Sequence, residues 1–343
     1  MAKGSIRFPA EWEQQDAILL AWPTANSDWG ATLEDIEAVF IELATTISRF
    51  ERVIIVGDNK QHIHDLLANS QANLDNIGYH IIATNDTWAR DFGPLGVYQD
   101  GAPLLYDCGF NGWGLKFPAD KDNQINRQLY NQNAFSCPLL TQGIILEGGS
   151  IESDGAGTLL TTSQCLLSPN RNPQLTREQI EDFFTTHFGI KQLLWLDHGY
   201  LAGDDTDSHI DTLARLCPND TILYTACGNT TDEHFVALQQ MEQQLSTFKT
   251  PAGHRYTLSA LPWPQAQFDA EGQRLPATYA NFLIINDAVL VPTYADPADN
   301  KALAIIQGAF PEREVIGINC NPVIVQHGSL HCLTMQLPQG TLS

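Results

Sequence analysis

Cys332 could act as a nucleophile. It follows a polar, glycine-containing segment, Gln326–His331, and a thiolate is intrinsically reactive near neutral pH. The adjacent His331 is a poor choice for its base, because neighbouring side chains on a strand point to opposite faces. Local context leaves two interpretations open, a nucleophile and a buried core cysteine.

Gly203–Asp211 gathers carboxylates around a histidine. His209 and Asp211 lie two residues apart and would share one face of an extended chain, together with Asp205 and Asp207. Such a set could perform acid–base chemistry, bind a hard cation such as Mg²⁺, or form solvated turns. An EF-hand is not expected, because the segment lacks the spacing of that loop. The pattern alone leaves the other three roles open.

Two further polar segments contain ionisable groups. Asp91 follows Trp88 and Arg90 within Asn85–Pro94, and Glu147 precedes two glycines that permit close backbone approach. The alternatives are structural: an Arg90–Asp91 ion pair, a core tryptophan and an exposed glutamate. Each segment is weak evidence by itself.

Short strands and amphipathic helices must position these segments. Hairpin chemistry, with Asn, Asp or Gly between apolar runs, predicts three strand pairs: Ile144–Leu146 with Thr158–Thr162, Thr212–Leu216 with Ile222–Thr225, and Phe282–Ile285 with Ala288–Thr293. Apolar residues at helical spacing predict helices over Thr32–Phe50, Lys60–Ser70, Thr176–Phe188, Thr231–Thr247 and Ala298–Phe310. Asp35, three residues after Thr32, suggests an acidic capping box. A hairpin plus a helix therefore recurs about every 60 residues.

The charge balance excludes several classes of partner. The chain has 343 residues, with 18 Lys and Arg against 40 Asp and Glu, and a formal charge of −22. Phosphate-backbone binding depends on Lys and Arg, so no nucleic acid is expected, and anionic lipid would be repelled. No apolar run approaches the roughly 20 residues of a membrane helix. Seven cysteines without a C-x-x-C pair predict free thiols in a reducing cytoplasm.

Together the segments resemble the agmatine deiminase family, which is grouped with the bacterial peptidyl-arginine deiminases in the guanidino-group-modifying superfamily. The matching stretches are Pro9–Trp12, Ala21–Pro23, Asn85–Pro94, Phe110–Gly114, Leu146–Ser150, Gly203–Asp211, Tyr279–Tyr294, Asp296–Asp299 and His331–Cys332. The resemblance implies an α/β fold, a pseudo-five-fold propeller of ββαβ units (the pentein fold), with the site in its central channel. It also implies one catalytic domain over residues 1–343.

The resemblance assigns a role to each chemical group. Cys332 would form a covalent amidino intermediate, and Asp91 and Asp211 would grip the guanidinium nitrogens. His209 would protonate departing ammonia and then deprotonate water, while Glu147 orients it. The expected substrate-binding residues are Trp88, Asp205, Trp113, Asp86 and Gly328, with Asp205 as the acceptor for the distal amine and Asp204 and Asp207 behind it. The expected reaction converts agmatine and water to N-carbamoylputrescine and ammonia, without metal or organic cofactor.

Two positions depart from the family pattern, which commonly reads Gly-Gly-Gly-Asn-Ile-His-Cys up to the nucleophile and Gly before the catalytic histidine. Here His327 and Ser329 stand in the first motif and Ser208 in the second. Both departures could alter the channel wall and hence the substrate preference, although neither removes a catalytic group.

Alternative functions remain open at this level. Free arginine could be the substrate if Arg90, Arg171 or Arg215 met its α-carboxylate; peptidyl-arginine is less attractive, because there is no spare length for a further C-terminal domain. A non-catalytic polyamine- or ribosome-binding protein on the same fold is another class. A papain-like protease would need a Cys–His pair but no ring of carboxylates. The sequence leaves open whether the chain forms a homo-oligomer.

Overall fold

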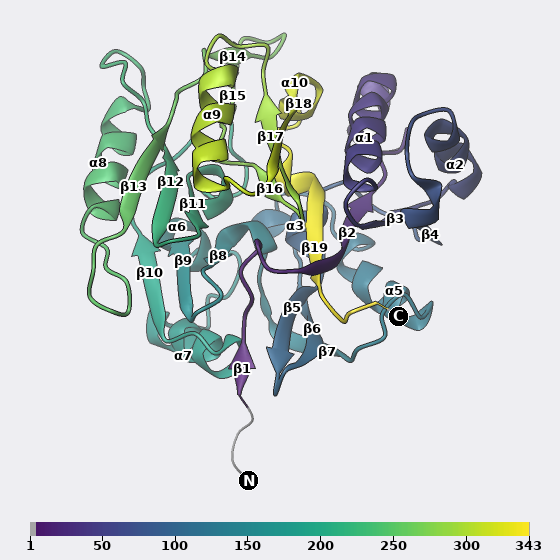
Figure 1. Ribbon diagram of the computed structural model, residues 1–343, viewed down its shortest axis with the longest axis horizontal. Helices are drawn as coiled ribbons and strands as arrows, with labels where there is room; N and C mark the ends of the chain where they lie inside the picture. The colour runs from purple at the N-terminus through teal and green to yellow at the C-terminus, as the bar shows by residue number, and fades with distance from the viewer. Residues whose placement is uncertain (1–4, 343) are drawn as a thin grey trace.

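Five sheets of three or four strands form the framework of the computed structural model, which describes residues 5–342. In each sheet one strand pairs antiparallel with a neighbour on one side and parallel with a neighbour on the other. A helix connects the two parallel strands, as such crossovers require. The ββαβ unit predicted from the resemblance is therefore confirmed in all five sheets (Figure 1).

The units follow one another along the chain. The first contains β19 (Thr334–Pro338), β2 (Gln15–Ala21), α1 (Leu33–Ile47), β3 (Arg52–Gly57), α2 (Lys60–Ala68) and β4 (Ile77–Ile81). The second contains β1 (Ile6–Arg7), β5 (Leu95–Gln99), β6 (Ala102–Gly109), α5 (Ile125–Asn131) and β7 (Leu139–Ile145). The third contains β8 (Ile151–Ser153), β9 (Thr158–Thr162), α6 (Ser163–Leu166), α7 (Arg177–Phe188) and β10 (Gln192–Leu196).

The last two units contain three strands and one helix each. The fourth contains β11 (Ala214–Cys217), β12 (Thr221–Thr225), α8 (Phe235–Leu245) and β13 (Thr257–Leu261). The fifth contains β16 (Leu283–Ile284), β17 (Ala288–Thr293), α9 (Asp299–Ala309) and β18 (Glu314–Asn319). The remaining elements are α3 (Ala89–Phe92), α4 (Gly112–Leu115), α10 (Asn321–Ile324) and the small ribbon β14 (Gln267–Phe268) with β15 (Arg274–Leu275). Helices α1, α5, α7, α8 and α9 lie around the rim, and α3 lies near the middle (Figure 1).

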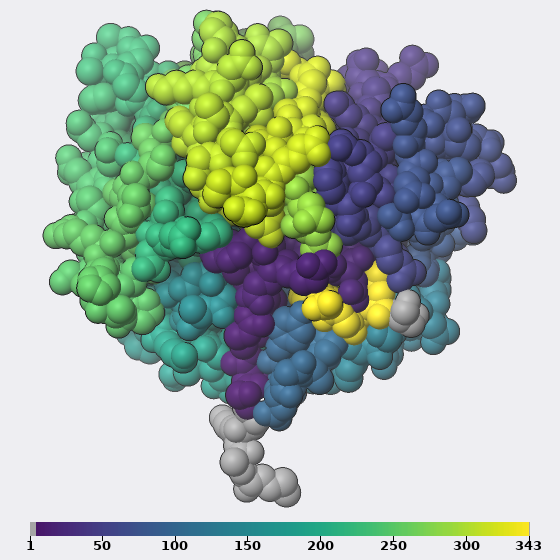
Figure 2. Space-filling model, in the orientation of Figure 1, coloured from purple at the N-terminus to yellow at the C-terminus, as the bar shows by residue number. Residues whose placement is uncertain are grey.

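The C-terminal strand closes the ring. β19 pairs antiparallel with β2, so the first unit takes one strand of its sheet from the other end of the chain. The N-terminal and C-terminal segments accordingly meet on one face of the molecule (Figure 2). Since the 3₁₀ turn His331–Leu333 immediately precedes β19, ring closure also positions Cys332.

The core forms where helices cover the inner strands. Ile18 and Leu20 on β2 are fully buried, as is Phe40 on the inner face of α1. Burying each such side chain contributes about 1.5–3 kcal/mol, so the apolar runs of the sequence drive this packing. Across residues 5–342 every helix is too short or too polar to traverse a lipid bilayer.

Most predicted elements are present, with local corrections. The hairpin predicted from Ile144–Leu146 is wrong: β7 pairs parallel with β6, and β8 is the partner of β9. The capping box at Thr32 is also wrong, because the Thr32 side chain makes no cap hydrogen bond. A complete capping box is found instead at Thr176, which begins α7 with Gln179 as its partner.

Candidate active site

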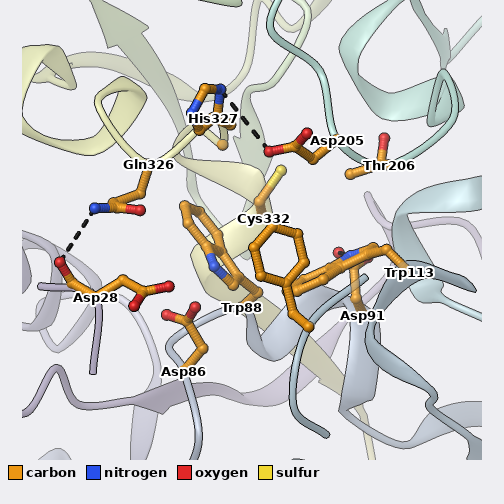
Figure 3. Close-up of a pocket in the computed structure, with 12 residues that line it drawn as sticks. Asp28, Asp86, Trp88, Asp91, Trp113, Asp205, Thr206, Gln326, His327 and Cys332 are labelled. Carbon is orange, nitrogen blue, oxygen red and sulfur yellow. Dashed lines mark hydrogen bonds and ion pairs between the residues drawn. The ribbon is translucent and has the colours of Figure 1, made fainter. Parts of the chain in front are cut away.

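A cavity of about 170 Å³ opens at the centre of the ring, and segments from several units line it (Figure 3). Its lining residues are Asp28, Asp86, Trp88, Asp91, Trp113, Phe117, Asp205, Thr206, Gln326, His327, Gly328 and Cys332. All five residues predicted to bind substrate are among them, together with the predicted nucleophile and one guanidinium-binding carboxylate. His209, Asp211 and Glu147 are buried outside this lining.

Cys332 lies in a buried polar environment. Its Sγ is 3.9 Å from Asp211 Oδ2 and 3.4 Å from Asn281 Oδ1. Asn281 also accepts a hydrogen bond from the Cys332 backbone N–H at 3.3 Å. Burial raises the pKa of the Cys332 thiol well above its ordinary value, and the charges of Asp211 and Asp91 raise it further. The empty site therefore favours a protonated thiol.

Asn281 also belongs to the site, although the sequence motifs gave it no role. It precedes the β16–β17 hairpin, is fully buried, and accepts from the His331 N–H at 2.9 Å. Its Nδ2 faces the Asp211 carbonyl at 3.4 Å. A polar residue ahead of an apolar strand was the available signal, but such residues usually belong to turns.

Asp91 and Asp211 form a buried pair with unequal surroundings. Asp91 accepts from Trp113 Nε1 at 2.9 Å and from the Gly149 N–H at 3.0 Å, yet burial and the nearby Asp211 raise its pKa well above the ordinary value. Burial opposes ionisation of Asp211 too, but the hydrogen bond and charge of His331 lower its pKa. Among the described residues, Asp211 Oδ1 has no hydrogen-bond partner. The surroundings therefore oppose ionisation at Asp91 and favour it at Asp211.

His209 lies behind the two carboxylates. Its Nδ1 is 3.5 Å from Asp91 Oδ1, and neither ring nitrogen has a hydrogen-bond partner within residues 5–342. Burial lowers the pKa of His209 to about 3, although Asp211 opposes this. The imidazole is therefore neutral across the physiological range and able to accept a proton.

Glu147 is hydrogen-bonded to Arg171 and not to His209, which it was expected to orient. Arg171 Nε donates to both carboxylate oxygens of Glu147, at 2.9 and 2.8 Å. Ligand atoms of Glu147, Cys165 and His209 nevertheless lie within 4.8 Å of one another, a donor set that could hold a soft metal ion. The Arg171 cation beside Glu147 opposes a metal there.

Two glycines allow the close packing of this site. A Cβ on Gly149 would lie 2.6 Å from His209 Nδ1 and 2.8 Å from Asp91 Oδ1, so the backbone needs a residue without a side chain. A Cβ on Gly328 would lie 2.2 Å from the Trp88 ring. These contacts give a physical reason for glycine at both positions.

Trp113 reaches the site from a left-handed turn. All four residues of Gly112–Leu115 have positive φ, with 54° at Trp113 and 69° at Leu115. A non-glycine residue in this region costs about 1–2 kcal/mol. The turn directs the Trp113 indole onto Asp91, so a locally unfavourable backbone holds a cavity wall.

The outer part of the cavity is more exposed and acidic. The Asp205 side chain is 45% exposed, and its Oδ2 is 3.9 Å from His327 Nδ1 (Figure 3). Asp204 and Asp207, expected behind Asp205, do not line the cavity. Asp204 accepts the Ser208 N–H at 2.7 Å, and Asp207 pairs with Arg171 at 2.6 Å. Both therefore shape the loop.

His327 and Ser208 occupy backbone conformations that suit glycine. Their φ angles are 66° and 61°, the left-handed region that non-glycine residues seldom adopt. The resemblance placed glycine at both positions, so the turns are kept although the residues differ. His327 is held by a contact of 2.7 Å between its Nδ1 and the Gly203 carbonyl.

The three arginines considered as α-carboxylate partners lie outside the cavity lining. Arg90 donates to the His331 carbonyl at 3.4 Å, and Arg215 pairs with Glu152 at 3.0 Å. Arg171 is committed to Glu147 and Asp207. All three are buried and paired with protein groups.

A five-unit α/β ring with a thiol, a histidine and several carboxylates around one cavity is the architecture of the pentein enzymes that modify guanidino groups. A dimethylarginine dimethylaminohydrolase structure shares the fold, with a TM-score of 0.52 at 11% identity over 94% of this chain and 100% of that one. The expected pentein fold is confirmed.

Comparisons with known proteins identify the family. Residues 7–338 match the model of the Porphyromonas-type peptidyl-arginine deiminases, and the chain belongs to this family. It is 32% identical to an agmatine deiminase of Pseudomonas aeruginosa, covering 97% of this chain and 95% of that protein. The expected enzyme class, a hydrolase acting on the C–N bond of a linear amidine, is confirmed.

Solved structures of relatives carry two kinds of name. A putative arginine deiminase from Porphyromonas gingivalis is 47% identical, with a TM-score of 0.94 over 98% of this chain and 100% of that one. A cysteine-to-serine variant of C. jejuni agmatine deiminase with substrate bound is 36% identical, with a TM-score of 0.93 over 99% of this chain and 98% of that one. The names of these relatives therefore point to two substrates, arginine and agmatine. The charges that line the cavity bear on which of the two fits this chain.

Proposed function

We propose that this protein hydrolyses agmatine to N-carbamoylputrescine and ammonia. The observation that carries the proposal is the cavity lining, which has carboxylates at both ends and neither arginine nor lysine among the described residues. Agmatine has a guanidinium at one end and an ammonium at the other. Asp91 and Asp211 suit the first charge, and Asp205, Asp86 and Asp28 suit the second.

The guanidinium binds first as a complete cation. Its ordinary pKa is about 13, so it stays charged and its planar N–H fork matches carboxylate oxygens. Asp91 and the free Oδ1 of Asp211 accept these hydrogen bonds, while Trp88 covers the plane by cation–π contact. The binding step delivers a positive charge beside a thiol whose pKa is raised by burial and by anions.

Cys332 then attacks the guanidinium carbon. The arriving cation offsets Asp91 and Asp211, so the thiol loses its proton, and neutral His209 is the group able to take it. A C–S bond forms, His209 returns the proton to the leaving nitrogen, and the C–N bond breaks as ammonia departs. The covalent product is an amidino-thioether cation.

Water completes the reaction. His209 removes a proton from water, which adds to the amidino carbon; the C–S bond breaks and the thiol regains a proton. Glu147 stabilises protonated His209 through its charge, since its oxygens already accept from Arg171. Guanidinium and water are thereby converted to a neutral urea and an ammonium ion.

Free arginine fits the same cavity less well. Its α-carboxylate would meet the acidic outer part, which Asp205, Asp86 and Asp28 line. The Lys116 ammonium lies behind this wall and already donates to the Asp205 carbonyl at 2.6 Å and to Asp207 at 2.8 Å. The buried arginines once considered for this carboxylate are all paired elsewhere. Charge repulsion therefore favours the decarboxylated amine over the amino acid.

Parallel assays of agmatine, arginine and an arginyl peptide test the proposal. We expect ammonia and a carbamoyl product in equal amounts from agmatine, with kcat/KM about tenfold or more above arginine, because the α-carboxylate of arginine would meet several carboxylates at the partly exposed outer end. Cys332→Ser protein is the control, and ammonia release that persists there would identify a contaminant. Negligible turnover of agmatine would overturn the proposal in favour of the arginine or peptidyl-arginine alternative, or of a binding protein if no guanidine reacted.

We also propose that the chain acts as one catalytic domain over residues 1–343 in the cytoplasm. All seven cysteines are free and buried in the structure, and the site uses groups from Asp28 to Cys332. An oxidising compartment would put such a thiol nucleophile at risk.

A further inference from the structure

A line of buried side chains runs inward from Asp211, away from the cavity. His331 Nδ1 is 2.7 Å from Asp211 Oδ2, and His331 Nε2 is 2.7 Å from Glu11 Oε2. Glu11 is 7% exposed, His331 2% and Asp211 fully buried. The mechanism proposed above uses neither Glu11 nor His331.

Each of these short contacts requires a proton between nitrogen and oxygen. A neutral imidazole donates from one nitrogen only, so two hydrogen bonds to two carboxylates need a second proton. The two 2.7 Å contacts thus point to two protons shared among the three groups, with a single negative charge in total. Glu11 and Asp211 favour this protonated imidazole, whereas burial, Arg215 (Nη2 at 3.3 Å from His331 Nε2) and Arg90 lower the pKa of His331 and oppose it. Such a line ties the protonation of Asp211 to that of Glu11.

Cations on the inner side keep Glu11 ionised. Arg215 Nη2 is 3.0 Å from Glu11 Oε2, and Arg90 Nη2 is 3.8 Å from the same oxygen. Burial alone would raise the pKa of Glu11, but His331, Arg215 and Arg90 lower it well below the ordinary value. An anionic Glu11 draws the proton of Nε2 towards itself, which leaves Nδ1–H to donate to Asp211.

We propose that Glu11 and His331 are positioning residues that hold Asp211 as an anion with Oδ1 free to bind the guanidinium. The inference rests on the proposed function in one respect, the role of Asp211 as a guanidinium ligand. His331 occupies Oδ2, so only Oδ1 remains for a ligand, and that atom is buried without a partner among the described residues. The line thereby sets both the charge and the orientation of the carboxylate.

The charged groups facing Asp211 make its ionisation dependent on this line. His331 and His209 lie beside it, Arg215 lies further in, and Asp91 and the Cys332 thiol stand on the cavity side. If His331 no longer donated, burial and the neighbouring Asp91 would cause Asp211 to take a proton. The thiol would then lose a nearby anion, and its pKa would fall.

The test compares two readouts that move in opposite directions. We expect His331→Gln and Glu11→Gln to lower kcat/KM for agmatine by about 10- to 100-fold, as is typical when a residue that orients a ligand-binding group is lost. The same variants should be alkylated by iodoacetamide at pH 7, without ligand, about threefold faster or more, because thiolate is more abundant. Damage to the fold alone would not produce this inverse pair.

Matched variants separate positioning from packing. Glu152→Gln alters the same buried cluster through Arg215 but does not contact the line to Asp211, so both rates should stay within about twofold. His331→Asn retains a donor near the Nδ1 position and should recover part of the kcat/KM lost in His331→Gln. Thermal unfolding of every variant shows which proteins are folded, and Glu11→Gln carries the test if the histidine variants are not.

Three outcomes would overturn the proposal: unchanged alkylation in Glu11→Gln and His331→Gln, kcat/KM within twofold of the parent, or equal effects in Glu152→Gln. Alkylation of the ligand-free protein does not depend on the substrate. If the parent protein failed to turn over agmatine, that arm would still decide whether Glu11 and His331 control the charge at Asp211.

Discussion

The two ends of the cavity differ in how firmly their charged groups are held. At the reacting end, Asp91, Asp211 and Cys332 are at most 3% exposed, and each has a hydrogen-bond partner or a charged neighbour. At the outer end, Asp205 is 45% exposed and its ion pair with His327 spans 3.9 Å. Charged interactions are stronger in the buried region, where water screens them less. The inner end therefore suits the proposed reaction, and the outer end suits selection among cationic substrates.

Only one of the departures from the family pattern lies at the outer end, because Ser208 and Ser329 are buried beside the inner groups. His327 lies in the outer wall. The residues proposed as nucleophile, acid–base histidine and guanidinium ligands, namely Cys332, His209, Asp91 and Asp211, match the pattern of the resemblance. Substitution at the outer end changes a screened contact, while substitution at the inner end would leave a buried charge without its partner. Five measurements would sharpen or break this contrast.

The largest effect is expected at the nucleophile. Cys332→Ala removes the sulfur that forms the covalent intermediate, so kcat for ammonia release should fall by about 10⁴-fold or more. Cys108→Ala, which removes a buried thiol outside the cavity, serves as the matched control and should retain activity. Comparable losses in both proteins would mean that Cys332 matters only for packing.

Asp211→Asn should come next. Loss of one partner in a buried charged interaction costs about 3–5 kcal/mol, which corresponds to a fall of about 10²–10⁴-fold in kcat/KM. Steady-state kinetics with agmatine measure it, and circular dichroism checks that the variant is folded. If kcat/KM fell by less than about tenfold, Asp211 would contribute no more than the exposed carboxylates of the outer end.

Binding of agmatine should release a proton at neutral pH. Burial and Asp211 raise the pKa of Asp91, and a bound guanidinium should lower it again, so binding is expected to displace a proton from the site. Below that pKa, affinity should rise by up to about tenfold per pH unit as pH increases, because the bound state holds fewer protons. Calorimetric titration of Cys332→Ala protein in buffers of different ionisation enthalpy would count the proton. Proton uptake, or none, would contradict the assignment.

Asp205→Asn should have a smaller effect, confined to binding. An exposed ion pair contributes about 1 kcal/mol, so KM for agmatine should increase by about fivefold with kcat nearly unchanged. Added salt should weaken binding by the parent protein more than binding by the variant. A fall in kcat to match Asp211→Asn would remove the distinction between the two ends.

His327→Gly should change activity least. The variant restores the residue that suits a φ of 66° and removes the contact with Asp205, so agmatine kcat/KM should change by about threefold or less. Guanidines with a bulkier distal group should gain relative to agmatine, because the outer wall loses its imidazole. Equal changes for every substrate would show that His327 does not affect selectivity.

Much of the site was predictable because its chemistry depends on residue types that have few other uses together. Cys332, His209, Asp91 and Asp211 were candidates on their motifs, the resemblance gave them roles, and the structure brings them to one centre. Asn281 and Glu11 lie in matching stretches but received no role, because each acts through contacts with residues far along the chain. Local spacing carries no signal for such pairs.

The fold, too, was predictable in part from the sequence. The helical patterns predicted α1, α2, α7, α8 and α9 to within a few residues at each end, whereas α5 was not recognised. Sequence spacing could not show that β7 crosses to a parallel partner in place of forming a hairpin, since either pairing buries the same apolar residues. Five-fold closure came from the resemblance alone.

Because β19 is both the strand that completes the first sheet and the continuation of the turn bearing Cys332, the nascent chain cannot assemble a working centre while residues 334–338 are still unpaired. During synthesis the sulfur therefore meets its carboxylates only when the two termini dock. Activity should therefore appear only after the ring has closed. A chain that lacks these few residues should be inactive rather than partly active.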